Sequence, residues 1–329
     1  MAVLVAGGAG YIGSHTALML RRLGEEVVIA DSLYKGHKDA AKGCKLMVGD
    51  LRNSDFLDEV FTTNKIDAVI DFAADSLVGE SMIDPLKYYN NNVASTCNLL
   101  GKMHEHNVRK IVFSSTAATY GEPENIPIFE NDRTFPTNPY GETKLAVERM
   151  LKWCDKAYGI KFVALRYFNA AGADPQGEIG EDHLPESHLI PIILQTALGQ
   201  RESIGIFGDD YETKDGSCVR DYIHVNDLSE AHILALKKLK DGGKSDVFNL
   251  GNGKGFSVKE VIEEARKVTG MEIKTVIEKR RSGDPAVLIA SSQKAQTHLD
   301  WKPKFNDLTT ILETAWNWHK SHPNGYNDR

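Results

Sequence analysis

Residues 2–15 read AVLVAGGAGYIGSH, and this stretch decides the fold. Five apolar residues, typical of a buried β-strand, precede glycines at every third position, Gly7, Gly10 and Gly13. Glycine in this arrangement permits a tight strand-to-helix turn, lets the backbone approach a pyrophosphate, and lets the helix pack closely on the strand. The free amides at the start of the helix also attract phosphate. The stretch therefore predicts the first strand and helix of a dinucleotide-binding unit.

Asp31 ends the second apolar run, EVVIAD at residues 26–31. A carboxylate there can accept hydrogen bonds from the hydroxyls of an adenosine ribose, and its charge repels a ribose phosphate. We therefore expect NAD rather than NADP as the cofactor, with a solvated loop carboxylate as the alternative interpretation. After the third run, Asp50 can either reach the adenine or belong to an ordinary turn.

Strand and helix patterns alternate through the first half of the chain. Apolar runs typical of strands lie at residues 2–7, 26–31, 45–50, 67–74, 110–115 and 161–168. Helical patterns between them lie at residues 10–23, 54–63, 84–106 and 139–158. Strands that are apolar throughout are buried on both faces, so the pattern predicts an α/β fold with a doubly wound, Rossmann-like parallel sheet over residues 1–168.

The second half, residues 169–329, has shorter strands and more glycine, proline and charged residues. We expect it to form mainly a smaller α/β domain that binds the substrate, with helices at residues 258–269 and 308–320. Residues from about 216 to 240 are expected to return to the first domain.

Composition excludes several classes of function. A chain of 329 residues, 41% of them hydrophobic, can bury a sizeable core. Its net charge of −7, without a basic block, argues against a nucleic-acid partner, and no apolar stretch is long enough to cross a membrane. The cysteines, which form no CxxC pair, are Cys44, Cys97, Cys154 and Cys218. We expect reduced thiols in a cytoplasmic protein, with neither a disulfide framework nor a metal site.

Tyr140 and Lys144 lie four residues apart in NPYGETK and so share one face of a predicted helix. A phenol normally has a pKa of about 10, and a nearby ammonium together with the positive ring of oxidised NAD favours the phenolate. Tyr140 can then accept a proton from a sugar hydroxyl while hydride leaves the same carbon. Thr116, in the hydroxyl-rich FSSTAATYG, can hold the reacting oxygen. Each pattern by itself also occurs by chance or as a turn cap.

The chain resembles the nucleotide-sugar epimerases of the extended short-chain dehydrogenase/reductase family over almost its whole length. The motifs that carry the resemblance are GGAGYIGSH, FAADSLVGES, YYNNNV, SSTAATYG, NPYGETK, RYFNAAGA, GEDH, IFGDDY, VRDYIHVNDL, NLGNGKGFSV and RRSGDPA. The resemblance implies a cytoplasmic homodimer of galactose metabolism that keeps NAD bound and interconverts UDP-glucose and UDP-galactose through a 4-keto intermediate. Another NAD-dependent nucleotide-sugar epimerase, or a dehydrogenase, is the alternative.

The resemblance also implies roles for individual residues. The catalytic group is matched by Thr116, Tyr140 and Lys144. Contacts to NAD are matched by Gly7, Gly10, Tyr11, Ile12, Gly13, Asp31, Ser32, Asp50, Leu51, Phe72, Ala73, Ala74, Asn91, Thr116, Tyr140, Lys144 and Tyr167. Contacts to the UDP-sugar are matched by Asn169, Leu189, Phe207, Arg220, Arg281, Asp284 and Leu288. Two arginines suit a diphosphate, with an ion pair to Asp221 or Asp227 as the alternative for Arg220.

Leu288 matches a family position that lines the sugar pocket, where tyrosine tends to exclude an N-acetyl group. Leucine is smaller, so we expect N-acetylated UDP-sugars to be substrates as well. The alternative is that Leu288 is an ordinary core residue of the apolar run AVLIA.

Some positions depart from the family pattern. Ser76 stands where some members place a lysine near the cofactor phosphates, and Asp71 stands where many have histidine, with no evident reason for an acid. A 4,6-dehydratase usually has an acid pair after the catalytic threonine, whereas Ala117 and Ala118 follow Thr116 here. A non-enzymatic NAD-sensing module could lose the catalytic pair, which this chain retains.

Overall fold

The computed structural model describes residues 1–281 and 285–328, and its largest element is a seven-stranded sheet with the order β10-β6-β5-β4-β1-β2-β3. Each neighbouring pair runs parallel. The strands are β1 (Ala2–Ala6), β2 (Glu26–Asp31), β3 (Lys45–Val48), β4 (Ile66–Asp71), β5 (Lys110–Ser114), β6 (Lys161–Tyr167) and β10 (Asp246–Leu250). This is the doubly wound α/β fold that the alternating pattern predicts.

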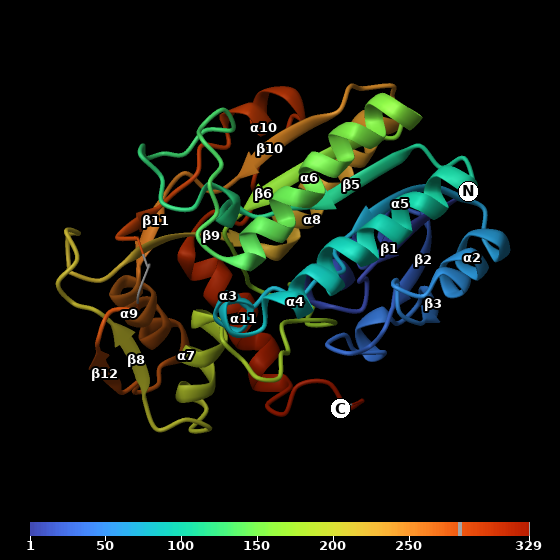
Figure 1. Ribbon diagram of the computed structural model, residues 1–329. Helices are drawn as coiled ribbons and strands as arrows, with labels where there is room; N and C mark the ends of the chain where they lie inside the picture. The colour runs from blue at the N-terminus through green and yellow to red at the C-terminus, as the bar shows by residue number, and fades with distance from the viewer. Residues whose placement is uncertain (282–284, 329) are drawn as a thin grey trace.

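Helices cover both faces of the large sheet (Figure 1). Alternate residues of β1 point to opposite faces, so Val3 and Val5 join one core while Leu4 joins the other. The core that contains Val3 includes α1 (Tyr11–Arg22), α8 (Val225–Lys240) and α10 (Gln293–His298). The core that contains Leu4 includes α2 (Ser54–Thr63), α5 (Ser95–Glu105) and α6 (Pro139–Tyr158). Burial on both faces explains the apolar residues of the central strands, whereas β3 lies at an edge of the sheet and is partly exposed, so the predicted burial of that run on both faces was wrong.

The strand order reverses at β1. The chain continues from β1 to β2 and β3 on one side and then crosses to β4 on the other, so Ala6 lies opposite both Ala30 and Asp71. Ligands of doubly wound folds bind in the crevice at the carboxyl ends of the strands at such a switch point. Gly7 and Phe72, which follow β1 and β4, therefore lie at the expected binding crevice.

The prediction of a single helix over residues 84–106 is wrong in detail. The structure has α4 (Pro85–Tyr88), a π-helical segment (Tyr89–Ala94) and α5, and α3 (Val78–Ile83) precedes them. The π-helical segment presents amide side chains to Asp75: Asn91 donates to its carboxylate and Asn92 accepts from its backbone amide. These tertiary hydrogen bonds accompany the local widening of the helix, which hydrophobic periodicity does not report.

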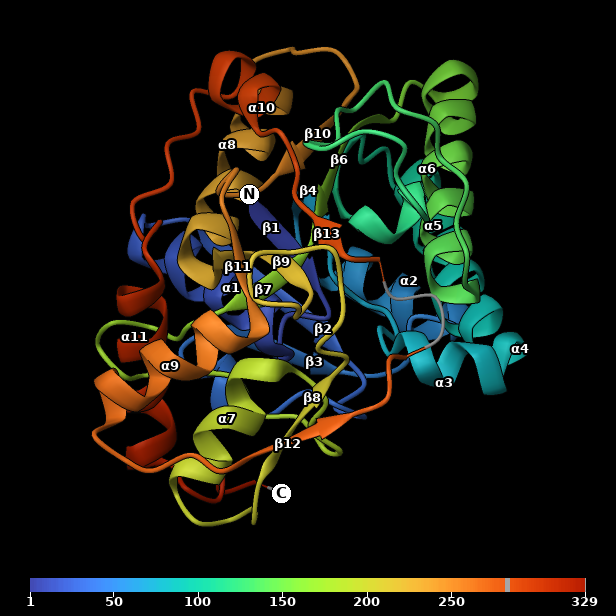
Figure 2. The ribbon, with the colours of Figure 1, turned by 90° about the vertical axis from the view of Figure 1, so that its left-hand side faces the viewer.

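The second half of the chain forms a smaller helical and β layer beside the large sheet, and Figure 2 shows α7, α9, β8 and β12 grouped there. Its helices are α7 (Leu189–Ala197), α9 (Val258–Thr269) and α11 (Leu308–Ser321), so the two predicted helices are present. Its strands are β7 (Asn169–Ala171), β8 (Ile204–Phe207), β9 (Val219–His224), β11 (Gly255–Ser257), β12 (Thr275–Glu278) and β13 (Val287–Leu288). Strand β9 pairs with β7, β11 and β13.

Three elements of the second half pack with the large sheet: α8 and α10 cover one of its faces, and β10 lies at its edge. Helix α8, which lies within the residues expected to return to the first domain, packs against α1. Strand β10 joins the edge of the sheet beside β6, which the sequence patterns did not predict. Among the described residues, no helix has both the length and the apolar character needed to cross a membrane.

Candidate functional site

The positions after β1 require glycine for different physical reasons. Gly7 has φ of 71°, and a Cβ there would lie 2.7 Å from the backbone nitrogen of Ala73. A Cβ on Gly13 would lie 2.2 Å from the carbonyl oxygen of Gly7. Only glycine therefore lets the β1–α1 turn pack against itself and against the end of β4.

Gly10 differs because the fold itself leaves room for a side chain there. The nearest atom to a Cβ at Gly10 is the Gly7 carbonyl oxygen, at an ordinary 3.5 Å. Gly10 is also the N-cap of α1, and within the described part of the chain no side chain caps the helix. Open space above a helix start with free amides fits a bound pyrophosphate.

Asp31 ties the glycine loop to the end of β2. Its carboxylate accepts the backbone amides of Ala9 at 2.9 Å and Leu33 at 2.8 Å. Burial raises the pKa of Asp31, while both hydrogen bonds lower it. Carboxylate oxygens can each accept more than one hydrogen bond, so Asp31 retains capacity for ribose hydroxyls. The neighbouring Ser32 is exposed.

Asp50 follows β3 and forms an ion pair with Arg52, with 2.5 Å between Oδ2 and Nη2. This guanidinium holds the pKa of Asp50 below its usual range. Asp50 also accepts the Arg52 amide at 2.8 Å, so it takes part in the turn that was one of the two interpretations. Leu51 is buried beside it.

Residues after β4 line the other side of the switch point. The Phe72 ring packs against His232 of α8 with 4.6 Å between centroids. Ala73 and Ala74 continue the same segment, and Asn91 Nδ2 donates to Asp75 Oδ2 at 3.0 Å. Ser76 is exposed beyond them.

The predicted catalytic residues meet where β5 ends and α6 begins. Thr116 follows β5, and its hydroxyl accepts the amide of Ala118 at 3.1 Å. The Thr116 side chain also forms a hydrogen bond with the phenol of Tyr140, in the first turn of α6. One turn later, the Lys144 Nζ donates to the carbonyl oxygen of Ser114 at 2.8 Å. The four-residue spacing predicted only that Tyr140 and Lys144 share one face of a helix, and the fold brings Thr116 to them.

Burial acts in opposite senses on the two titratable groups. It raises the pKa of Tyr140, and the hydrogen bond with Thr116 lowers it. It lowers the pKa of Lys144 to about 8, and the charge of Asp71 raises it. The Lys144 ammonium also lies 4.8 Å from the centre of the Phe113 ring. The lowering of the Tyr140 pKa by Lys144 and by oxidised NAD stays a prediction.

Asp71 ends β4 and is buried. Nothing in the sequence indicated why an acidic residue stands at this position. Burial raises its pKa to about 6, while the charge of Lys144, the Ala73 amide and the Thr96 hydroxyl lower it. Asp71 is thus the carboxylate that balances the buried ammonium of Lys144.

Ser114 also helps to position the side chains of the site, although the sequence motifs did not indicate this role. Its carbonyl anchors Lys144, and its hydroxyl lies 2.5 Å from the phenol oxygen of Tyr167. Burial raises the pKa of Tyr167. Ser114 belongs to the quoted hydroxyl cluster, but only the pairing of β5 with β6 brings it to Tyr167.

The expected substrate residues of β7, β9 and β13 lie on adjacent strands. Asn169 Nδ2 donates to the backbone carbonyl of Asp221 at 3.3 Å, and Leu288 lies opposite Arg220 in the sheet register. Arg220 Nη1 donates to the carbonyl oxygens of Val219 and Pro285, each at 2.9 Å. These strands bring the three side chains into one region.

The carboxylates suggested as alternative partners of Arg220 accept from backbone amides. Asp221 Oδ1 accepts the Asn252 amide at 2.8 Å. Asp227 accepts the amides of Lys304 and Phe305, each at 2.9 Å. Both carboxylates thus serve loop structure.

The remaining expected substrate residues come from separate segments. The Arg281 guanidinium lies 3.8 Å from the centre of the Phe207 ring, a cation–π contact that joins two of them. Leu189 begins α7, and Leu288 packs against the core of Ala117, Tyr120 and Ile128. Asp284 lies outside the described residues.

A buried ion pair supports the catalytic end of the sheet. Arg166 of β6 and Glu148 of α6 are joined at 2.6 Å, and their side chains are 4% and 0% exposed. The Ser115 hydroxyl donates to the same carboxylate at 2.6 Å, and Arg166 Nη1 donates to the Tyr120 phenol at 2.9 Å. This network connects α6 to the segment that carries Thr116, and it left no motif in the sequence.

The chain is similar in sequence and in structure to known epimerases. The model of the NAD dependent epimerase/dehydratase family matches residues 3–251. The UDP-glucose 4-epimerase of Halalkalibacterium halodurans is 65% identical over 326 residues, covering 99% of this chain and 98% of that protein. A crystal structure of a UDP-glucose 4-epimerase is 57% identical, with a TM-score of 0.98 over 99% of this chain and 100% of that chain. The Bifidobacterium longum enzyme, solved with NAD+ and UDP, is 39% identical, with a TM-score of 0.93 over 99% and 100% of the two chains.

Proposed function

The chain belongs to the NAD dependent epimerase/dehydratase family, and from this premise we propose that it interconverts UDP-glucose and UDP-galactose at carbon 4 of the sugar. The observation that carries the proposal is the junction of Tyr140, Thr116 and Lys144 beside the glycine crevice. This arrangement places a proton acceptor, a hydroxyl and an ammonium at the carboxyl end of the sheet, where a dinucleotide binds.

The cofactor is NAD. The open space at Gly10 and the start of α1, which no described side chain caps, fit its pyrophosphate, and the carboxylate of Asp31 fits its adenosine ribose. Bound there, NAD would supply the acceptor for the hydride from carbon 4 and the donor for its return to the same carbon.

Tyr140 acts as the base and then as the acid. Its phenol oxygen takes the proton of the sugar 4-hydroxyl and gives a proton back when the 4-keto sugar is reduced. Thr116, already hydrogen-bonded to the phenol, holds the reacting oxygen beside it. The Lys144 ammonium, fixed by the Ser114 carbonyl, favours the phenolate that burial disfavours.

The nucleotide part of the substrate serves as the anchor. We assign its diphosphate to Arg220 and Arg281, with Asn169 as a further contact, because guanidinium groups bind phosphate oxygens bidentately. Binding energy from these remote groups holds the 4-keto sugar while it turns to present its other face. Leu189, Phe207 and Leu288 complete the proposed walls of this site.

Leu288 supports a finer proposal about the sugar. It packs beside Ala117, next to Thr116, so it lies near the catalytic end of the substrate site. Leucine leaves more room there than tyrosine, and we propose that UDP-N-acetylglucosamine and UDP-N-acetylgalactosamine are accepted. A dehydratase is disfavoured because Ala117 and Ala118 supply no acid after Thr116.

The test is an assay with UDP-galactose and no added cofactor. An epimerase forms UDP-glucose without accumulating NADH, because the hydride returns within one active site. The denatured protein should release close to one equivalent of NAD. A dehydrogenase, the alternative, would instead require added NAD and release NADH in proportion to product, and that result would overturn the proposal.

We further propose a homodimer in the cytoplasm. The resemblance to the family supports the dimer, and so do exposed apolar side chains on the segment of α3 and α4, where Ile83 is 86% and Leu86 78% exposed. The four cysteines are all described and all unpaired, as in a reducing compartment. Light scattering on a sizing column should give twice the chain mass, and Leu86→Glu should reduce it to one chain mass. A wild-type monomer would overturn the dimer.

A further inference from the structure

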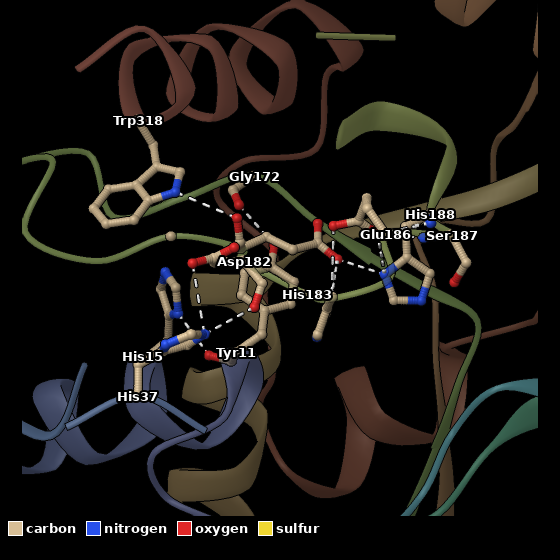
Figure 3. Close-up of polar contacts among 12 residues, drawn as sticks. Tyr11, His15, His37, Gly172, Asp182, His183, Glu186, Ser187, His188 and Trp318 are labelled. Carbon is tan, nitrogen blue, oxygen red and sulfur yellow. Dashed lines mark hydrogen bonds and ion pairs between the residues drawn. The ribbon is translucent and has the colours of Figure 1, made fainter. Parts of the chain in front are cut away.

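The loop between β7 and α7 carries a group of metal-binding side chains that the catalytic residues do not use. Residues 181–188 read EDHLPESH and place Glu181, His183, Glu186 and His188 within eight positions. One donor atom from each side chain lies within 4.8 Å of every other. Figure 3 shows His183, Glu186 and His188 around this point.

The separations of these donor atoms are close to those around one small ion for His183, whereas those of His188 depart from them in both directions. His183 Nδ1 lies 3.3 Å from Glu181 Oε1 and 3.6 Å from Glu186 Oε2. His188 Nδ1 lies 3.9 Å from Glu186 Oε1 and contacts Glu181 Oε1. Ligands of a tetrahedral zinc ion, each about 2.0–2.1 Å from the metal, are roughly 3.3 Å apart. The His183 separations are close to this value, and the His188 side chain has to shift for the group to enclose a zinc ion.

Charge balance also favours a cation. The side chains of Glu181 and Glu186 are each only 3% exposed, and the ion pairs that the structure describes for them are with His183 and His188. Two buried carboxylates require positive charge nearby. Either both imidazoles carry a proton, or a divalent ion neutralises the carboxylates while both imidazoles stay neutral and bind it through Nδ1.

We propose that Glu181, His183, Glu186 and His188 form a structural zinc site. Imidazole nitrogens with carboxylate oxygens suit zinc better than magnesium or calcium, which prefer oxygen alone. Four protein ligands leave no open coordination position, which is the arrangement of a structural rather than a catalytic zinc ion. The expectation of no metal site rested on the scattered cysteines, and this site uses none of them.

The position of the loop explains what a metal would stabilise. On one side, Trp318 of α11 donates to the Glu181 carbonyl at 3.3 Å, and the Tyr11 ring of the cofactor loop lies 6.2 Å from the His183 ring, edge to face. On the other side, His188 directly precedes Leu189, the first residue of α7. A zinc ion would therefore fasten the start of α7 beside the cofactor loop.

The first experiment measures metal content. The wild-type protein is purified without chelator, loaded with zinc chloride, freed of excess metal and analysed by inductively coupled plasma mass spectrometry. We expect close to one zinc per chain. In His183→Gln and in His188→Gln, the zinc dissociation constant against a competing chelator should rise more than about a hundredfold, because even outer-sphere changes cost 10- to 100-fold.

His106→Gln is the matched control. His106 lies with Asp58 and Glu105 in a second His–carboxylate group, whose two carboxylates are 48% and 57% exposed rather than buried. This variant should retain the one tightly bound zinc of the wild type. Equal zinc retention in His183→Gln, or a wild-type protein that retains no zinc after loading, would overturn the proposal in favour of protonated ion pairs.

Two further measurements cover variants that fold poorly. X-ray absorption of the wild-type protein should show nitrogen and oxygen ligands at about 2.0–2.1 Å, whereas sulfur at about 2.3 Å would place the zinc on a cysteine and overturn the site. Zinc chloride should raise the melting temperature of the metal-free wild type, because ligand binding to the native state stabilises it. The folded His188→Gln variant should show no such rise, and an equal rise would overturn the proposal.

Discussion

The buried carboxylate of Asp71 and the buried ammonium of Lys144 stabilise each other's charged form at the carboxyl end of the sheet. Burial alone raises the pKa of Asp71 and lowers the pKa of Lys144. The two residues come from β4 and α6, and their interaction keeps a cation one turn from Tyr140.

Asp71→Asn should therefore shift the alkaline limb of the kcat profile to lower pH. The pKa of Lys144 is about 8 with Asp71 present, and removal of the negative charge lowers it further, so the ammonium is lost earlier as pH rises. Asp67→Asn, on the same strand but paired with Lys110 at 3.1 Å, is the control and should leave the profile unchanged. Identical profiles for Asp71→Asn and wild type would show that Asp71 does not act through Lys144.

Tyr140→Phe should retain UDP and NAD binding and lose kcat by about 10²- to 10⁴-fold, the usual contribution of a general acid–base group. Thr116→Val should also lower kcat, by a smaller factor, because the phenol remains. Tyr158→Phe, at the exposed far end of α6, is the matched control. Steady-state kinetics with UDP-galactose and calorimetric UDP binding measure both effects. Near-normal turnover in Tyr140→Phe would show that Tyr140 is not the base.

We expect Gly10→Ala to impair NAD binding and Gly13→Ala to impair the stability of the fold. Among the residues that the structure describes, a methyl group at Gly10 meets only the Gly7 carbonyl, at 3.5 Å, so the protein should keep its melting temperature and lose bound NAD. A methyl group at Gly13 would lie 2.2 Å from that oxygen and should destabilise the fold by about 1–3 kcal/mol. Gly101→Ala in α5, with open space around it, is the control. Full NAD content in Gly10→Ala would contradict the assigned phosphate position.

Leu288→Tyr should lower kcat/KM for N-acetylated UDP-sugars far more than for UDP-galactose. The larger ring narrows the site beside Ala117 and clashes only with the bulkier group on carbon 2. The ratio of kcat/KM values in wild type and variant measures the selectivity. A wild-type enzyme inactive on both N-acetylated sugars would show that another residue closes the pocket.

Glu148→Gln should lower the free energy of unfolding by about 3–5 kcal/mol, because it leaves the buried Arg166 guanidinium without its partner charge. Glu142→Gln, on the same helix and paired with Arg149 at the surface, should cost less than about 1 kcal/mol. Urea denaturation of the two variants measures the difference. An equal decrease in the free energy of unfolding in both variants would show that the buried ion pair stabilises the protein no more than the surface pair does.

Local signals predicted several elements to the residue. Helix α6 begins and ends as expected, because Asn138 caps its start, Pro139 occupies the first turn, and Gly159 adopts φ of 68° after its end. Helix α9 likewise begins at the capping box of Ser257 and Glu260. These signals involve neighbours in sequence, so they act before any tertiary contact forms.

Non-local contacts decided what the sequence patterns missed. Strand β10 is short and becomes recognisable only through its pairing with β6. The π-helical segment is accompanied by hydrogen bonds between its amide side chains and Asp75. Hydrophobic periodicity contains neither kind of information, because it describes one segment at a time.

The sequence by itself determined the doubly wound fold, the glycine crevice and the spacing of Tyr140 and Lys144, because each depends on residues close together in the chain. Only the tertiary structure decided the electrostatic partnership of Asp71 with Lys144 and the convergence of donor atoms from Glu181 to His188. The charge balance of a buried group depends on every element packed around it, and the direction of a side chain depends on the neighbours that hold it.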